Sequence, residues 1–594
     1  MNDMRFSADS GHSSRDQNNK RSRRQSDDDD ITEIITLDAD SDSDTDSLES
    51  VSQWLKRKRP ESITISDGPT PSTSQASQVE NESKGEAASS STDKILNMIT
   101  LFIVEDLHTT SIVKDSGFKK FVQTLKPDLV LPTQDDILNN ILLLYGIERA
   151  NLLILLHSVD AISIAIERWT SFTDNTYATI KANFINADWE PQSYVLATVQ
   201  LGDTNSFALL NDKVLETLKM WEIENKVVST VYDWYRPPMD FLAPGQYQEL
   251  GKKMCCFALK LQTAIDNSFN SIPEIKAIID KCKQLVAYFL HNNVAEIYLH
   301  KYQNYLELSC DQLIQASSDD INSTYLMLDR LLSQKLAINS VLRDEDAIDG
   351  TRATELQLDD PEWLIIKEMV ATLKPFQLAK VVLYRVKDHI DSVSVVKPMI
   401  HSFCTNFLSA NNETTPVRLL KQRIREDLLT KFQLYVGQNE MTAPDYFDLA
   451  TYLDPRYKNQ EYMSNENRET IKRYIHDVYF AKNENNASKS SKLSMSSKAL
   501  SILFPSAPSE TANECLRYHN ESEIDKNLSP QKWWKLNERR YPTLSTVAKR
   551  HLCTHSTSKS IFTSRNASLR RKNLSPQIVD KLIFLNHKLK FDVI

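Results

Sequence analysis

The sequence predicts a mixed α/β protein that is mostly helical and carries a disordered N-terminal tail. Glycine is scarce, with 10 of 594 residues, which disfavours a many-turned β protein and favours long helices. Between residues 150 and 235 the apolar residues alternate as they do in strands, whereas the segments on either side repeat with helical spacing. Residues 1–92 are rich in Ser, Asp, Gln and Glu and nearly free of aromatic residues. Such a segment cannot bury enough apolar surface to offset its ordering entropy.

Two basic clusters in the tail, KRSRR and KRKRP, predict nuclear import. Short Lys/Arg runs in exposed chain are read by import receptors or attract nucleic acid. Solvated charge without a reader is the alternative. The residues concerned are Lys20, Arg21, Arg23, Arg24, Lys56, Arg57, Lys58 and Arg59.

Between the clusters lies an apolar tetrapeptide, Ile34, Ile35, Thr36 and Leu37, set among aspartates and glutamates. A disordered strand of this kind can add to an exposed sheet edge, with its acids meeting a basic rim. The pattern resembles motifs that bind the small ubiquitin-like modifier SUMO. An inert acidic linker is the alternative, and the sequence does not decide between the two.

The first ordered elements follow from the change in hydrophobic period. Helices are expected at 93–107 and 135–145, and then the pattern turns to strands. The expected strands are 160–171, 175–189, 192–202 and 226–234, with a helix at 211–225 before the last of them. Three strands, a helix and a fourth strand predict one α/β layer.

Beyond this layer the pattern is helical. Residues 263–480 are expected to form a helical domain, and 481–526 a flexible linker. Ser-Pro pairs at 529–530 and 575–576 each place a capping Ser before a first-turn Pro, which predicts two helix starts. The last helix carries an apolar stripe of Ile578, Leu582, Leu585 and Leu589.

Several classes of function lack support in the sequence. The seven cysteines are scattered, which is typical of a reduced intracellular protein. His551 and His555 flank Cys553, but three such residues are poor evidence for zinc, and no metal or cofactor is expected. No glycine-rich phosphate loop or hydrolase motif occurs. No stretch approaches 18 apolar residues, so neither a membrane span nor a membrane partner is expected.

Several blocks occur in an order that resembles the hAT superfamily of DNA transposases and the host proteins derived from them. LSPQKWWKLNERRYPTLSTVAKRHLC and LRRKNLSPQIVDKLIFLNHKLK look like the family's C-terminal dimerisation region. ERWTSFTDNTYATIKANFINADWEPQS resembles the strand pair around its first catalytic acid. INSTYLMLDRLL, DPEWLIIKEMVATLKPFQLA and ATYLDPRYKN are similar to blocks of its helical region. The resemblance covers residues 92–590.

The resemblance implies a ribonuclease H-like core interrupted by a large all-α insertion. The core would comprise 151–262 and be completed by a dimerisation region at 527–594, with a helical segment at 93–150 ahead of it and the insertion at 263–480. It also implies a chemistry in which three acids hold divalent metal for DNA strand cleavage.

The residues at the implied catalytic positions depart from the family pattern. The first acid, an Asp in the family, is Glu167, whose longer side chain displaces the carboxylate. Asp233 stands at the second position, but Trp234 replaces the Asn usually beside it. No Glu or Asp occurs from Cys553 to Pro576, where the third acid belongs. Glu167 and Asp233 are therefore interpreted as vestigial positions.

Three further departures agree with lost catalysis. Leu259 stands where the family has a His, and Asp320-Ile321 replaces an Arg-Trp associated with the flipped base. Residues 1–92 hold no Cys and only His12, so the family's zinc-binding BED finger is not expected in this sequence.

The leading hypothesis is a catalytically inactive, transposase-derived nuclear protein that dimerises and regulates chromatin or transcription. An active transposase and a scaffold of the SUMO pathway are the alternatives. The residues expected at the dimer interface, unless they pack only inside the monomer, are Trp533, Trp534, Tyr541, Leu544, Leu582, Leu585 and Leu589. Phosphate contacts with DNA would come from Arg539, Arg540, Arg570, Arg571 and Lys572. Homodimers, chromatin proteins, SUMO-modified proteins and the DNA backbone are thus the partners considered.

Overall fold

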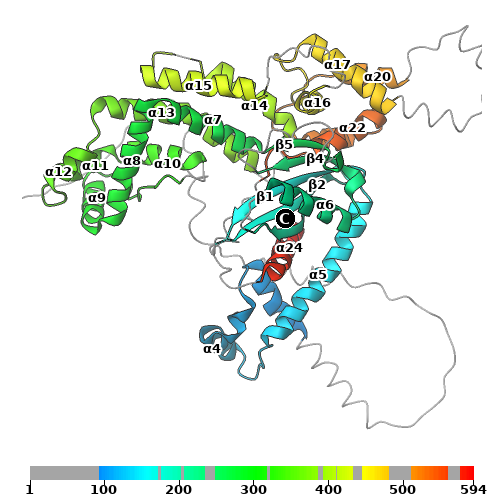
Figure 1. Ribbon diagram of the computed structural model, residues 1–594, viewed down its shortest axis with the longest axis horizontal. Coiled ribbons are helices and arrows are strands. Elements are labelled where there is room, and N and C mark those ends of the chain that lie inside the picture. The colour runs from blue at the N-terminus through cyan, green and yellow to red at the C-terminus, as the bar shows by residue number, and fades with distance from the viewer. Residues whose placement is uncertain are drawn as a thin grey trace, which may run out of the picture. The chain divides into compact units, whose positions relative to one another are not determined.

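The computed structural model describes residues 93–171, 175–202, 206–233, 248–317, 321–384, 392–409, 411–432, 444–480, 510–558 and 575–593 (Figure 1). Some sequence predictions lie outside these ranges. They are the disordered tail, the import clusters, the SUMO-like strand Ile34–Leu37, and the basic residues Arg570, Arg571 and Lys572.

One five-stranded mixed sheet stands within a mostly helical chain. Its order is β3-β2-β1-β4-β5. The strands are β1 (Ile162–Thr170), β2 (Thr176–Ile185), β3 (Pro191–Gln200), β4 (Val227–Tyr232) and β5 (Lys252–Cys255). β1 pairs antiparallel with β2 and parallel with β4, and β4 pairs parallel with β5. The four strands expected from alternation are confirmed, whereas the four-residue β5 is too short to show a period.

The helices and helical turns are η1 (Thr110–Lys114), α4 (Ser116–Leu125), α5 (Gln134–His157), α6 (Phe207–Met220), η2 (Glu224–Lys226), η4 (Gln248–Leu250), α7 (Phe257–Ser271), α8 (Pro273–His291), α9 (Asn293–Tyr305), α10 (Ile321–Ser333), α11 (Lys335–Val341), α12 (Gly350–Leu356), α13 (Asp360–Tyr384), η6 (Val393–Val395), α14 (Val396–Ser402), η7 (Phe403–Phe407), α15 (Thr415–Phe432), α16 (Tyr446–Leu453), α17 (Asn465–Ile475), η8 (His476–Phe480), α20 (Glu510–Asn520), α21 (Pro530–Asn537), α22 (Pro542–Leu552) and α24 (Pro576–Val593). A further helix spans residues 93–105.

The apolar face of the sheet carries one of the two large cores that the described residues form. Ile164 and Ile166 of β1 and Ile180 of β2 lie there with no more than 1% of their surface exposed. α5, α6 and α24 cover this face, and the core extends to the helix at 93–105. Because successive residues of a strand point to opposite faces, the same strands present a second set of side chains to the other side.

α24 closes the edge of the sheet at β3. The backbone N–H of Thr198 donates to the Asp580 carboxylate at 2.6 Å. α24 reaches the apolar core through Leu582 and the opposite side of the sheet through Ile583. Burial raises the pKa of Asp580 above its usual range, which the N–H bond partly opposes. An edge N–H is thereby satisfied inside the chain instead of remaining open for pairing.

The second large core joins the helices from α7 to α22. The prediction of a flexible linker over residues 481–526 is wrong for residues 510–520. α20 forms there and buries Cys515 and Tyr518. The polar stretch ahead of α20 obscured its apolar spacing.

The Ser529 cap is confirmed, since its hydroxyl accepts the N–H of Lys532 at 3.3 Å with Pro530 in the first turn.

Candidate functional site

The second face of the sheet is polar and buried. Glu167, Thr179, Lys181 and Ser229 lie on it with at most 4% of their surface exposed. Burying so many polar groups costs free energy unless each is hydrogen-bonded. A polar interior on one face of a sheet is therefore where a former or present reaction site is expected.

Glu167 and Asp233 come together, as the family resemblance implies. Ile166 of β1 pairs with Tyr232 of β4 in parallel register, and the Asp233 N–H donates to the Ile166 carbonyl at 3.0 Å. Glu167 and Asp233 are the residues that come directly after this pair, so they lie at the same level on neighbouring strands. Glu167 is 1% exposed, whereas Asp233 is half-buried at the strand end.

A lysine on the next strand contacts Glu167 directly. Glu167 pairs with Thr179 and Ala165 with Lys181 across β1 and β2, so Glu167 and Lys181 are diagonal neighbours on one face. Their Nζ and Oε2 atoms are 3.2 Å apart, and both side chains are at most 5% exposed. The carboxylate that would hold metal in the family is thus matched by a buried ammonium group.

The segment after α22 runs across this polar face and is hydrogen-bonded to it. The Ser558 carbonyl accepts from Lys181 Nζ at 2.7 Å, and the Ser556 carbonyl accepts the Phe257 N–H at 2.9 Å. The Thr554 hydroxyl lies 2.7 Å from that of Ser229. We call residues 553–558 the strap. It delivers backbone carbonyls and hydroxyls to the face where the family's third acid is expected.

The neighbouring thiol, Cys256, favours its neutral form. Burial raises the pKa of Cys256, and nearby Asp233 raises it further. Among the described residues, no group of three or more His, Cys, Asp or Glu side chains is placed to hold a metal ion. The acidic site retains two carboxylates, one of them paired with Lys181.

His551 belongs to the fold's interior. Its Nε2 lies 3.1 Å from the Tyr479 hydroxyl, and its ring lies 5.0 Å from that of Tyr446. Burial, aided by Arg550, lowers the pKa of His551 to about 3. The imidazole is neutral at physiological pH and links the end of α22, just ahead of the strap, to η8.

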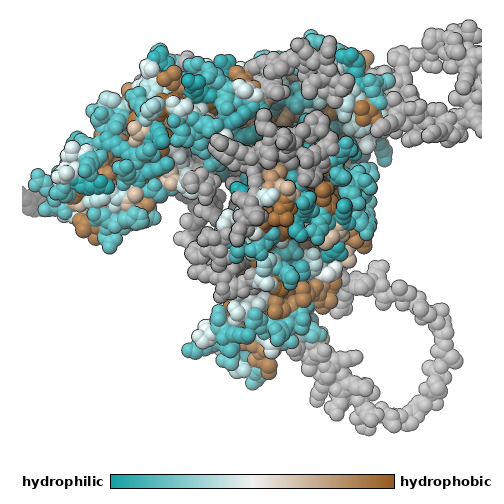
Figure 2. Space-filling model, viewed as in Figure 1, coloured by the Kyte–Doolittle hydropathy of each residue, from teal (hydrophilic) through white to brown (hydrophobic). Residues whose placement is uncertain are grey.

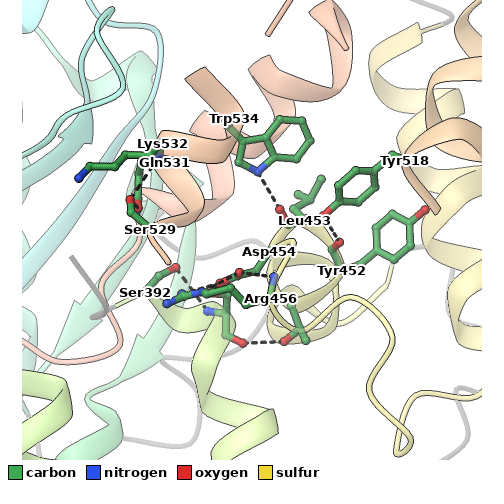
Figure 3. A network of polar contacts seen from close by, with 12 residues as sticks. Ser392, Tyr452, Leu453, Asp454, Arg456, Tyr518, Ser529, Gln531, Lys532 and Trp534 are labelled. Atoms are coloured by element: carbon green, nitrogen blue, oxygen red, sulfur yellow. Dashed lines mark hydrogen bonds and ion pairs between the residues drawn. The ribbon is translucent and has the colours of Figure 1, made fainter. Parts of the chain in front are cut away.

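The aromatic residues expected at a dimer interface pack largely inside the chain. Trp534, Tyr541, Leu544 and Leu582 are fully buried and Leu585 is 3% exposed, while Trp533 and Leu589 are half-buried. The Trp534 indole N–H donates to the Leu453 carbonyl at 3.0 Å (Figure 3). Fully buried side chains cannot contact a second copy without rearrangement. Their part in dimerisation stays a prediction, and the described chain uses them to join α21 to α16.

A buried charge network beside these aromatics was missed in the sequence. The Asp454 carboxylate accepts from Arg456 Nε at 3.0 Å, from Arg456 Nη2 at 2.8 Å and from the Ser394 hydroxyl at 2.7 Å. Tyr518 donates its hydroxyl to the Tyr452 carbonyl at 3.0 Å (Figure 3). The signal was present in the block ATYLDPRYKN, whose Asp and Arg are two residues apart.

Lys181 was also missed, although the sequence holds its signal. It is the single charged residue within the otherwise uncharged strand TYATIKANFI. A charge within a buried strand needs a partner, and the diagonal position on β1 is occupied by Glu167.

Of the predicted DNA contacts, Arg539 is exposed, and Arg540 forms an ion pair with Glu521.

Comparison with known proteins identifies two segments of this architecture. Residues 512–589 match the hAT family C-terminal dimerisation region, and residues 165–239 match the ZBED1 RNase-like domain. The first spans α20 to α24 and the second begins on β1 and passes the end of β4.

Curated relatives extend the similarity along most of the chain. Human zinc finger BED domain-containing protein 4 is 23% identical over 84% of this chain and 43% of its own length. Human zinc finger BED domain-containing protein 6 is 24% identical over 61% and 38%. RICESLEEPER 2 of Oryza sativa subsp. japonica is 20% identical over 84% and 75%. The chain spans less than half the length of the two human relatives. The match to the hAT dimerisation region and these relatives together support a hAT transposase-derived protein.

Proposed function

We propose that this protein is a catalytically inactive, nuclear descendant of a hAT transposase that dimerises and regulates chromatin or transcription. Its sheet would be the ribonuclease H-like core of the ancestor. The strand order, with three antiparallel strands followed by two parallel ones, and the match of residues 165–239 to an RNase-like domain support this assignment.

One observation carries the loss of catalysis: Lys181 lies against Glu167. Two-metal cleavage needs carboxylates that neutralise divalent cations and stabilise both reacting oxygens. A buried ammonium 3.2 Å from Glu167 already supplies the positive charge and repels a second cation. The sequence adds that no Glu or Asp lies between Cys553 and Pro576 to supply a third ligand. The vestigial reading of Glu167 and Asp233 rests on these two facts.

Self-association and a chromatin role have separate support. The matched dimerisation region supports a homodimer. The relatives are named for a BED zinc finger, and the tail of this chain carries two basic clusters of the kind that import receptors read. Exposed Arg539 offers a phosphate contact, but such contacts carry little sequence information. Recruitment through partner proteins, SUMO-modified ones included, therefore accounts for targeting better than direct base reading.

The test is a pulldown of the full-length protein from nuclear extract, with and without DNase, read by mass spectrometry. The proposal expects chromatin or transcription proteins that remain after DNase treatment. The tail strand is tested in the same assay by an Ile35→Ala, Leu37→Ala variant, with Ile63→Ala, Ile65→Ala as the matched control from a second apolar pair in the tail. Loss of SUMO-modified partners in the first variant alone would assign them to that strand.

Two outcomes would count against the proposal. If every partner disappears with DNase, direct DNA binding is the better account of targeting. If the full-length protein instead nicks supercoiled DNA with Mn²⁺, and Glu167→Gln abolishes the nicking, the alternative of an active transposase is correct.

A further inference from the structure

Hydrophobic residues gather over α5 (Figure 2), a helix that is long and apolar enough to cross a membrane by length and composition alone. One side of α5 buries Ile137, Ile141 and Leu152 in the core beneath the sheet, so α5 is a helix of the folded domain. Its exposed residues from Asn139 to Ile154 are all uncharged, and they do not identify an occupant. A cavity elsewhere in the chain is more informative, because its lining indicates the chemistry of a ligand.

This cavity, of about 590 Å³, lies beside the start of β4 and β5, where Val228 and Lys252 contribute to its wall. α16, α17, η8 and α22 supply the other walls (Figure 1). Asp233 follows the opposite end of β4, so the cavity is separate from the vestigial acids of the sheet. Its volume lies within the range of about 300–1,000 Å³ that is typical of small-molecule sites.

Tyrosine rings and aliphatic side chains make up most of the lining. Tyr446 of α16 is buried, and its hydroxyl lies 2.8 Å from that of Thr554, so the ring serves as a fixed wall. Tyr474 and Tyr479 are half-buried, with their ring centres 6.5 Å apart. Aromatic rings and nucleic-acid bases stack favourably on tyrosine. The lining therefore favours a ligand with a planar, largely apolar body.

Two cations line the cavity, Arg550 from the last turn of α22 and Lys252 from the start of β5. Neither forms an ion pair with a carboxylate of the described residues. Asp445, which follows the lining residue Pro444, is already paired with Lys397 at 2.7 Å. A phosphate monoester carries about 1.5–2 negative charges at pH 7 and would balance both cations. A single carboxylate would leave one of them uncompensated.

The cavity wall also holds a buried hydrogen-bonding atom that the described chain does not use. His551 lines the cavity and is 5% exposed, and its Nδ1 has no hydrogen-bond partner among the described residues. The other ring nitrogen, Nε2, lies 3.1 Å from the Tyr479 hydroxyl. Because the ring is neutral, Nδ1 is available to a polar group of a ligand. An unpaired buried polar atom costs free energy, which such a ligand would recover.

From these contacts we propose that the cavity binds a purine nucleoside monophosphate, with the base against the tyrosine rings and the phosphate at Arg550 and Lys252. The purine supplies the planar body, and its ring nitrogens and exocyclic groups supply a partner for His551. Sugar phosphates lack the flat ring, and aromatic monocarboxylates lack the second charge. Binding here goes beyond the proposed function and does not depend on it, so the chromatin pulldown and the nucleotide assay can fail separately.

The test is a titration of the full-length protein with AMP and GMP that carry a fluorescent methylanthraniloyl group on the ribose, followed by fluorescence anisotropy. Arg550→Met removes the guanidinium and is expected to weaken binding at least about 10-fold, because a hydrogen bond between charged groups is lost. Lys252→Met changes an exposed residue, where the fold is least affected, and is expected to weaken binding about 2- to 5-fold. Arg473→Met is the matched control. Arg473 is an exposed cation of α17 that does not line the cavity, and its loss should leave binding unchanged.

Competition identifies the parts of the ligand that the cavity requires. Unlabelled AMP or GMP should displace the labelled nucleotide, whereas adenosine and inorganic phosphate should each compete at least about 10-fold more weakly. The proposal is overturned if neither nucleotide binds saturably, or if Arg550→Met and Lys252→Met both leave the binding unchanged. It is also overturned if single-stranded oligodeoxyadenylate displaces the label at a lower concentration than AMP does, because the cavity would then belong to a nucleic-acid surface.

Discussion

Two of the buried ion pairs among the described residues, Asp454–Arg456 and Glu167–Lys181, lie in different surroundings. Asp454 and Arg456 join at two points, and the Asp454 carboxylate also accepts the Ser394 hydroxyl and the Arg456 N–H. Glu167 and Lys181 share one contact, between Oε2 and Nζ at 3.2 Å. Lys181 also donates to the Ser558 carbonyl of the strap. The first pair uses the planar geometry of a guanidinium, and the second uses a point charge on a flexible stem.

The difference suggests that the two pairs arose for different reasons. Asp454 directly follows Tyr452 and Leu453, whose carbonyls accept from Tyr518 of α20 and Trp534 of α21, so we interpret the Asp454–Arg456 pair as structural. The Glu167–Lys181 pair occupies a sheet face where the family resemblance implies metal. We interpret Lys181 as the fixed cation that compensates Glu167 in the absence of metal, which requires charge balance but no particular coordination geometry.

The largest expected effect is on the structural pair. Asp454→Ala leaves Arg456, which is 1% exposed, without its carboxylate, and it should lower the free energy of unfolding by about 3–5 kcal/mol. Urea denaturation followed by tryptophan fluorescence measures this loss. Glu355→Ala removes a carboxylate that is 57% exposed and paired with Arg352, and it should cost less than about 1 kcal/mol. Equal losses in the two variants would mean that the Asp454 network has no special role.

A smaller loss is expected at the sheet. Lys181→Met removes the ammonium but keeps the stem, and it breaks the single 3.2 Å contact between Lys181 and Glu167. We expect a loss of about 1.5–3 kcal/mol in the same urea assay, the value of a hydrogen bond between charged groups. Adding Glu167→Gln to Lys181→Met should recover part of it, because both charges are then gone. If the double variant is less stable than Lys181→Met, then Glu167 stabilises the fold independently of Lys181.

The third effect concerns His551 of α22, two residues ahead of the strap. Its pKa is about 3 in the folded protein, against about 6.5 when unfolded. Above pH 6.5 both states are neutral, and below it only the unfolded chain takes up the proton. Stability is therefore lost as pH falls from 6.5 toward 3, by about 1.4 kcal/mol per unit. His551→Gln keeps a hydrogen-bonding group for Tyr479 and does not titrate.

Urea midpoints at pH 7 and pH 5 provide the measurement for this histidine. Over that interval the wild type should lose about 2 kcal/mol more than His551→Gln. The same loss in both proteins would show that other groups cause the acid sensitivity.

Much of the fold could be predicted from local pattern. The alternation of apolar residues predicted β1 to β4, and the Ser529-Pro530 pair predicted the start of α21. β5 could not be predicted, since four residues carry no period, and α20 was hidden by the polar sequence before it. Alternation also indicated that β2 is buried, but it did not say what the strand's lysine would meet.

The candidate residues on the sheet could be located from the sequence, whereas the groups that contact them could be predicted only in part. Resemblance located Glu167 and Asp233, and their adjacency in the sheet agrees with it. The partner of Glu167 depends on register between β1 and β2, and the carbonyl of Ser558 depends on a segment nearly 380 residues away in sequence. Likewise, the burial of Trp534 and Tyr541 depends on α16 and α20, which sequence spacing within α21 and α22 does not reveal.

The most direct test of the central claim is a calorimetric titration of Mn²⁺ into four full-length proteins: the wild type, Glu167→Gln, Lys181→Met, and the Lys181→Met, Glu167→Gln variant. If Lys181 provides the cation for Glu167, the wild type shows no binding that depends on Glu167. Lys181→Met gains a weak Mn²⁺ site, and the added Glu167→Gln removes it. Mn²⁺ binding by the wild type that Glu167→Gln abolishes would contradict the account, because the acid would then still be a working metal ligand.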